Sequence, residues 1–200
     1  MYLSRLLLTG EKLHNPYEIH RSIWQAFPEA PEQDRDFLFR IEKRASCKAQ
    51  VLIQSHRQPL EGLEGIRLLA TKRLKLELPE VGSRLHFYLI ANPIKTIKDE
   101  HGRLDRNGEV KKCRVPLIKE GDQVEWLKRK LAKAATVEML EIDKQLPLNF
   151  RKNKHLGKIQ TYAFRGNLRI QSSEQLCECI LHGVGPAKAF GCGLLSLARA

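Results

Sequence analysis

The sequence predicts an α+β protein built from two similar halves, because one order of expected elements occurs twice. Strand, helix, strand, strand, helix, strand is the order in the first part, and the second part repeats it. Hydrophobic residues make up 42% and charged residues 29% of the 200 residues, which is typical of a globular chain. The βαββαβ order is that of a ferredoxin-like, or RRM-like, domain. We therefore expect two tandem ferredoxin-like domains, at residues 1–82 and 83–200.

The first half opens with an expected strand at residues 2–8 and a helix at about 16–27. The start of this helix is well specified. Asn15 can cap it, Pro16 suits its first position, and Glu18 completes a variant of the capping box. The remaining expected elements are strands at 36–42 and 50–54, a short helical stretch near 61–70, and a strand at 72–78.

The second half begins with an expected strand at residues 84–94 and continues with a helix from a cap at Asp122 to about 135. A second helix, capped by Ser172, should run to about 181. The other expected elements are strands at 137–142, at 158–164 with a hairpin continuation through Gly166 and Asn167 to 170, and at 194–198.

The charge of the chain points to a polyanionic partner. Lysine and arginine number 35 against 23 acidic residues, for a formal net charge of +12. Such an excess attracts phosphates and predicts salt-sensitive binding of nucleic acid. Part of it lies in an insert at residues 95–114, which we expect to be a loop or an extended arm; a solvated hairpin is the alternative. The candidate phosphate-binding residues there are Lys95, Lys111, Lys112 and Arg114.

The cysteines and the apolar runs indicate a soluble, cytoplasmic protein. Five cysteines form no C-x-x-C motif, and Cys177 and Cys179 lie two apart on an expected helix, so they point to different faces and make a poor metal clamp. Reduced thiols are the simplest account. No apolar run approaches the roughly 20 residues needed to cross a bilayer, so we expect no membrane association.

Near its end the chain carries two Gly-x-Gly pairs, Gly183–Gly185 and Gly191–Gly193, with Lys188 between them. Glycine permits a positive φ and a close approach to the backbone. Exposed amides beside a lysine suit a polyanion, although a merely flexible linker is the alternative. The hydrophobic segments on either side favour a loop that is fixed between a helix and a strand.

Tyr17 and His20 lie three residues apart on the first expected helix and share one side of it. His20 falls at the border of the apolar face, and histidine can give or take a proton near neutrality. Arg21 could counter a phosphate charge. Packing alone is the alternative for this pair.

The chain has no dense Asp/Glu cluster of the kind that binds catalytic metal ions. If the protein cleaves nucleic acid, we therefore expect it to do so without metal. The substrate would then be RNA, whose 2′-hydroxyl can attack the neighbouring phosphate. Whether His20 acts as base or acid stays open.

A second basic cluster, residues 151–158, precedes an expected strand and lies where it could meet the glycine-rich segment. Lys154 and Lys158 are candidate RNA contacts, and Lys158 is expected to open the strand. A disordered surface loop is the alternative for the cluster. The aromatic consensus of an RNA recognition motif is missing, so we expect recognition of RNA shape and phosphates rather than base stacking on a sheet.

Taken together, these segments resemble the CasE family, the CRISPR RNA-processing endoribonucleases of type I-E Cascade. The resemblance spans nearly the whole chain, and the Tyr-x-x-His helix with the glycine-rich tail is its most specific part. The matching segments are Met1-Tyr-Leu-Ser-Arg5, Pro16-Tyr-Glu-Ile-His-Arg-Ser-Ile-Trp-Gln-Ala-Phe-Pro28, Arg35-Asp-Phe-Leu-Phe-Arg-Ile-Glu42, Ala91-Asn-Pro-Ile-Lys-Thr96, Arg114-Val-Pro-Leu-Ile-Lys119, Gly157-Lys-Ile-Gln-Thr161 and 183–193.

The resemblance implies metal-independent cleavage at the base of a CRISPR repeat stem-loop, with a 2′,3′-cyclic phosphate or related end and no cofactor. It assigns the catalytic role to His20, an assisting role to Tyr17, and the family's glycine-rich loop to Gly183, Gly185, Gly191 and Gly193. The implied partners are the repeat hairpin, the mature guide RNA and other Cascade subunits, including the backbone subunit beside the 3′ hairpin. The alternative is an RNA-binding assembly subunit that does not cut. A coenzyme A-binding enzyme is a third, weaker interpretation of the glycines.

Overall fold

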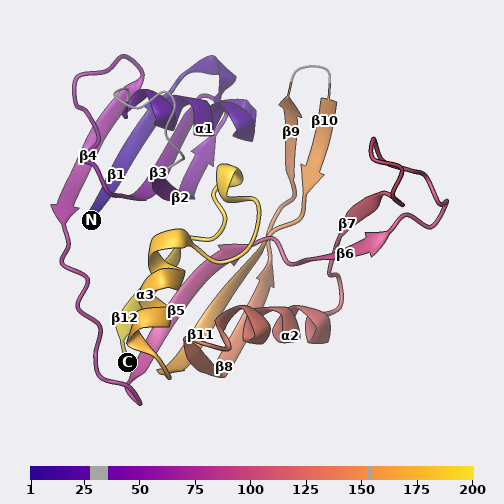
Figure 1. The fold of residues 1–200 in the computed structure, drawn as a ribbon. Coiled ribbons are helices and arrows are strands. Elements are labelled where there is room, and N and C mark those ends of the chain that lie inside the picture. Colours follow the sequence, from indigo (N-terminus) through magenta and orange to yellow (C-terminus); the bar gives the residue numbers. More distant parts are fainter. Residues whose placement is uncertain (28–35, 153–154) are drawn as a thin grey trace.

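The computed structural model describes residues 1–27, 36–152 and 155–200, and its main body contains two four-stranded sheets with helices packed against them (Figure 1). The first sheet has the order β2-β3-β1-β4, with antiparallel neighbours throughout. Helix α1 covers one of its faces. These elements are β1 (Tyr2–Thr9), the 3-10 helix η1 (Glu11–His14), α1 (Pro16–Gln25), β2 (Phe37–Ala45), β3 (Lys48–Ser55) and β4 (Ile66–Arg73).

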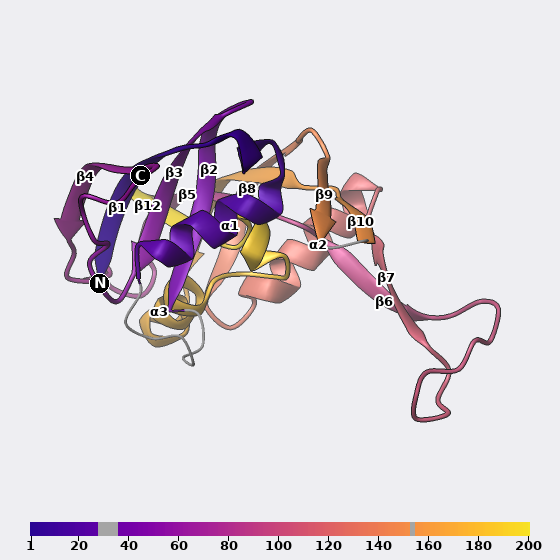
Figure 2. The ribbon, with the colours of Figure 1, turned by 90° about the horizontal axis from the view of Figure 1, so that it is seen from above.

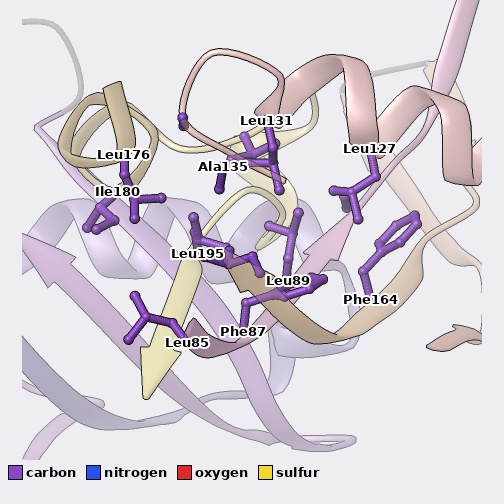
Figure 3. Close-up of a cluster of buried hydrophobic side chains, with 14 of the residues drawn as sticks. Leu85, Phe87, Leu89, Leu127, Leu131, Ala135, Phe164, Leu176, Ile180 and Leu195 are labelled. Carbon is purple, nitrogen blue, oxygen red and sulfur yellow. The ribbon is translucent and has the colours of Figure 1, made fainter. Parts of the chain in front are cut away.

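The second sheet has the order β12-β5-β11-β8, again with antiparallel neighbours. Two helices pack against this sheet. In the core between them and the sheet, leucines of both helices lie near Phe87 and Leu89, which belong to the strand at residues 84–91 (Figure 3). The elements are β5 (Arg84–Ala91), α2 (Glu120–Leu131), β8 (Ala135–Lys144), β11 (Tyr162–Ile170), α3 (Ser173–His182), the 3-10 helix η2 (Lys188–Phe190) and β12 (Leu195–Arg199).

The two sheets have the same topology. In each, the last strand of the half pairs with the first, the first with the third, and the third with the second. This repeated arrangement confirms the predicted α+β class with tandem ferredoxin-like folds. Strand β4 ends at Arg73 and β5 begins at Arg84, so the predicted boundary between residues 82 and 83 falls in the segment between the two sheets. The exact boundary stays a prediction.

Two short ribbons extend beyond the sheets. Strands β6 (Ile94–Lys98) and β7 (Lys112–Pro116) form an arm that projects from the main body in both views (Figures 1 and 2). Strands β9 (Leu148–Lys152) and β10 (His155–Ile159) form a second hairpin, which stands beside α1 (Figure 1).

The helical stretch predicted near residues 61–70 is wrong. In the described part of the chain no helix lies between β3 and β4, and residues 66–73 form a strand that pairs with β1. Gly65 explains the break, because it has a φ of +74° and its carbonyl accepts a 2.8 Å hydrogen bond from the Thr9 amide. Backbone pairing with a central strand therefore outweighs a weak local preference for helix.

The predicted hairpin at residues 158–170 is also wrong. Strand β10 ends at Ile159, and β11 runs without a turn through Gly166 and Asn167. A Cβ at Gly166 would lie 1.9 Å from the Met139 carbonyl oxygen, so the glycine serves close approach of β8 and makes no turn. Lys158 consequently lies inside a short hairpin strand and does not open β11.

Helix α2 begins earlier than the sequence predicted. Its N-cap is Lys119, and Asp122, the predicted cap, lies in its first turn.

Candidate functional site

Helix α1 is fixed at its start by Asn15, as the sequence predicted. The Asn15 side-chain oxygen accepts a hydrogen bond from the Tyr17 amide at 3.2 Å. In the expected capping box, the Glu18 side chain would accept a hydrogen bond from the Asn15 backbone N–H. Instead, that backbone N–H donates to the Lys12 carbonyl, and the Glu18 carboxylate pairs with Arg21 at 3.1 Å. Arg21 is thus an exposed residue with an acidic neighbour on its own helix.

His20 lies at the margin of the first core, half-buried, where the sequence placed it. Its ring stacks on Phe39 with centroids 6.2 Å apart and an interplanar angle of 25°, and it lies 5.9 Å from the Phe37 ring. The indole Nε1 of Trp24 donates a 3.2 Å hydrogen bond to His20 Nε2. Tyr17 is half-buried one turn earlier on the helix. An imidazole held in this way has a defined orientation and still borders solvent.

The glycine-rich segment of the second half reaches this histidine through Phe39. The 3-10 helix η2 contacts both α1 and β2. A Cβ at Gly191, directly after η2, would lie 3.3 Å from the Phe39 ring. Phe39 therefore touches the imidazole and the glycine-rich loop alike, and it joins residues that are far apart in the sequence into one site.

The glycines themselves are needed for packing. All four have φ between +73° and +91°. A Cβ at Gly183 would lie 2.9 Å from the Leu38 methyls, and one at Gly185 would lie 2.8 Å from the Trp126 indole. The amides of Gly183 and Gly193 donate to the protein carbonyls of Cys179 and Ile90. These contacts were not predicted from the sequence, which suggested amides open to a polyanion.

Lys188 lies in this loop, and its side-chain stem would be 3.3 Å from a Cβ at Gly193. Lys188 therefore adds a positive charge to the loop whose Gly191 packs against Phe39. Direct contact of Lys188 and of the four glycines with RNA stays a prediction.

The β9–β10 hairpin meets both parts of the site, as expected for the second basic cluster. The Phe150 ring lies 4.4 Å from Phe190 of η2. Backbone atoms of Arg151 form two hydrogen bonds with the Asn15 side chain. Lys158 is exposed opposite Asn149. Lys154 lies outside the described residues.

The structure does not bring the basic insert to His20. Lys95, Lys111, Lys112 and Arg114 are exposed on the β6–β7 arm, which projects away from α1 (Figures 1 and 2). The insert is thus an extended arm, as expected, and the arm is built on a paired hairpin, as in the alternative considered for it. Its outer turn is held by Arg103, whose guanidinium bonds to the Asp99 carboxylate at 2.6 Å and lowers the pKa of that carboxyl.

A cleft of about 780 Å³ opens beside the loop between the two halves. It is lined by His14 and Arg44 from the first half and by Gln145, Phe190 and Gly191 from the second. Partial burial lowers the pKa of Arg44, whose guanidinium donates a hydrogen bond to the His14 carbonyl. The cleft therefore places the Arg44 guanidinium beside the glycine-rich loop.

Among the residues that the structure describes, no three His, Cys, Asp or Glu side chains gather in a way that could hold a metal ion. None of the helices in the described part of the chain is long and apolar enough to span a membrane.

Known proteins share both this sequence and this fold. The model of the family described as CRISPR associated protein matches residues 1–199. The CRISPR system Cascade subunit CasE of Escherichia coli strain K12 is 44% identical over 199 residues, covering 99% of both chains. The chain belongs to the CasE family. The family resemblance drawn from the sequence motifs is thereby confirmed.

Solved structures agree with the CasE assignment. The crystal structure of the CRISPR-associated protein Cas6e from E. coli K-12 matches with a TM-score of 0.86 and 42% identity, over 100% of both chains. A structure of the CRISPR endoribonuclease Cse3 bound to a 19-nucleotide RNA matches with a TM-score of 0.78 and 30% identity, again over 100% of both chains.

Proposed function

We propose that this CasE-family chain is a metal-independent endoribonuclease that cleaves CRISPR precursor RNA at the base of the repeat stem-loop. Family membership and the likeness to Cse3, a protein described as an endoribonuclease and bound to RNA, support this proposal. The observation that carries it is the meeting of His20 and the glycine-rich loop at Phe39. A proton-transfer group and a close-packed loop from opposite halves thus form one surface.

In the proposed reaction the ribose 2′-oxygen attacks the adjacent phosphorus, and the bond from phosphorus to the 5′-oxygen breaks. One proton leaves the 2′-hydroxyl and one is taken up by the departing 5′-oxygen, so the products are a 2′,3′-cyclic phosphate and a 5′-hydroxyl. His20 transfers one of these protons, and Tyr17 assists one helical turn away. Arg21 and Lys188 supply positive charge near the phosphate.

After cleavage the protein keeps the mature guide RNA and joins other Cascade subunits in the cytoplasm. The E. coli relative carries the name of a Cascade subunit, which supports this part of the proposal. Basic residues of the β6–β7 arm and of the β9–β10 hairpin hold the repeat stem by its phosphates. The net charge of +12 is consistent with such binding.

The test is incubation of the purified protein with a repeat hairpin in excess chelator. We expect two fragments, one with a 5′-hydroxyl and one with a cyclic phosphate. The matched control is the same hairpin with a 2′-deoxynucleotide before the cleaved bond, which should stay intact. Tight binding of uncut ribose hairpin would favour the non-catalytic assembly subunit. Cleavage that requires added Mg²⁺ would contradict the metal-independent reaction.

A further inference from the structure

Trp24 lies one turn after His20 on α1, and its indole nitrogen faces the imidazole. The distance from Trp24 Nε1 to His20 Nε2 is 3.2 Å. An indole N–H can only donate, so His20 Nε2 must be the acceptor and cannot carry a proton. The single proton of the neutral imidazole then resides on Nδ1. We infer that Trp24 is a positioning residue, which fixes the tautomer and the orientation of His20 for the proposed RNA cleavage on which this role rests.

The indole is itself held in place by aromatic packing. Its ring meets Phe37 edge-on, with centroids 5.2 Å apart and an interplanar angle of 73°. Phe37 stacks in turn on Phe27 at 5.3 Å, and both phenylalanines are buried in the first core. Rotation of the indole away from His20 would disrupt this packing. The hydrogen bond is therefore preorganised by the fold before RNA arrives.

This arrangement has a chemical consequence for the histidine. While the indole bond exists, the Nε2 lone pair is occupied and a proton can leave the neutral ring only from Nδ1. Proton abstraction by Nε2 requires the Trp24 bond to open. A substitution that removes the indole N–H therefore changes which nitrogen bears the proton, even when the helix and the aromatic cluster are retained.

The tautomer can be measured without RNA by long-range ¹H–¹⁵N correlation spectra of labelled protein, with the His20 signals identified from their loss in His20→Ala. We expect the Nδ1–H form in the native protein. Trp24→Phe keeps an aromatic ring beside Phe37 but removes the donor, and it should shift His20 toward the Nε2–H form. Trp126→Phe changes the other tryptophan of the chain but leaves the Trp24 donor in place, so the His20 tautomer should be unchanged. A native protein with the Nε2–H form would overturn the inference.

Cleavage provides the second readout. In single-turnover assays Trp24→Phe should slow cleavage about 10- to 100-fold, the range expected for a misplaced catalytic group, while RNA affinity stays within about twofold. Should Trp24→Phe fold poorly, benzothienylalanine at position 24 replaces the indole N–H by sulfur with almost the same shape. A changed tautomer with an unchanged rate would refute the positioning role. If the native protein cuts no RNA, the proposed function fails, whereas the spectra still decide the tautomer.

Discussion

The side chain of Asn15 pairs with the backbone of Arg151, 136 positions later in the chain. Its amide group donates to the Arg151 carbonyl at 2.8 Å, and its oxygen accepts from the Arg151 amide at 3.2 Å. The same oxygen caps α1 at the Tyr17 amide. One asparagine therefore fixes the start of the histidine-bearing helix and attaches the β9–β10 hairpin to it.

Asn15→Asp separates these two tasks. Aspartate still accepts from the Tyr17 and Arg151 amides, but it loses the donor to the Arg151 carbonyl. We expect nearly native stability in thermal unfolding and faster hydrogen exchange at the hairpin amides. Asn15→Ala loses the cap as well and should lower the free energy of unfolding by about 0.5–2 kcal/mol. Equal stability losses for the two variants would contradict separate roles.

His20→Ala should abolish cleavage and leave RNA affinity nearly unchanged. Loss of a proton-transfer group costs about 10²- to 10⁴-fold in rate, whereas one imidazole contributes little to holding a polyanion. Single-turnover cleavage and filter binding at fixed salt measure the two effects. His182→Ala is the matched control, since His182 is exposed on α3 and pairs only with Glu178 among the ion pairs of the described residues. Residual cleavage close to native would remove His20 from the reaction.

Gly185→Val should destabilise the protein through a steric clash. A Cβ at Gly185 would lie 2.8 Å from the Trp126 indole, and the backbone φ is +82°. Gly108 has a φ of +79° and nothing within 4 Å of a Cβ, so Gly108→Val carries the backbone strain alone. The difference in unfolding free energy between the two variants should be about 1–3 kcal/mol, the cost of overpacking. Equal melting temperatures would mean that the loop does not need the close approach to Trp126.

Lys111→Ala combined with Lys112→Ala should weaken RNA binding and flatten its salt dependence. If both lysines touch phosphates, the log–log slope of affinity against salt falls by up to about 2. Lys72→Ala with Lys75→Ala is a matched loss of two charges around the end of β4, on the opposite side of the molecule from the arm (Figure 1). An unchanged slope in the arm variant would exclude these two lysines from the interface.

Cys192 should resist thiol reagents in the folded protein. Its side chain is fully buried, and burial raises the pKa of the thiol to about 12, so almost no thiolate forms at neutral pH. Cys47 is exposed and should react readily. Mass spectrometry after a short labelling step at pH 8 identifies the modified cysteines. Labelling of Cys192 before unfolding would show that the glycine-rich loop opens.

Local signals in the sequence predicted the parts of the site that depend on neighbouring residues. Asn15 and Pro16 marked the start of α1, Ser172 marked the start of α3, and the spacing of apolar residues placed His20 at the edge of a core. The i, i+4 spacing of His20 and Trp24 was visible too, but it does not distinguish a hydrogen bond from packing.

Long-range contacts were not accessible in this way. Nothing in the sequence around Gly185 indicates Trp126, which supplies the reason for that glycine. The strand at Ile66–Arg73 forms because β1 offers a pairing edge, although the local pattern suggested a helix. In both cases the deciding partner comes from a distant segment, so no periodic pattern records it.

Phe39 belongs to the first half of the chain and lies against a loop from the second, so neither half produced by itself would contain a complete imidazole environment. Two separately expressed halves should therefore cleave RNA only after they associate. Reassembly of the fragments would then be reported by RNA cleavage.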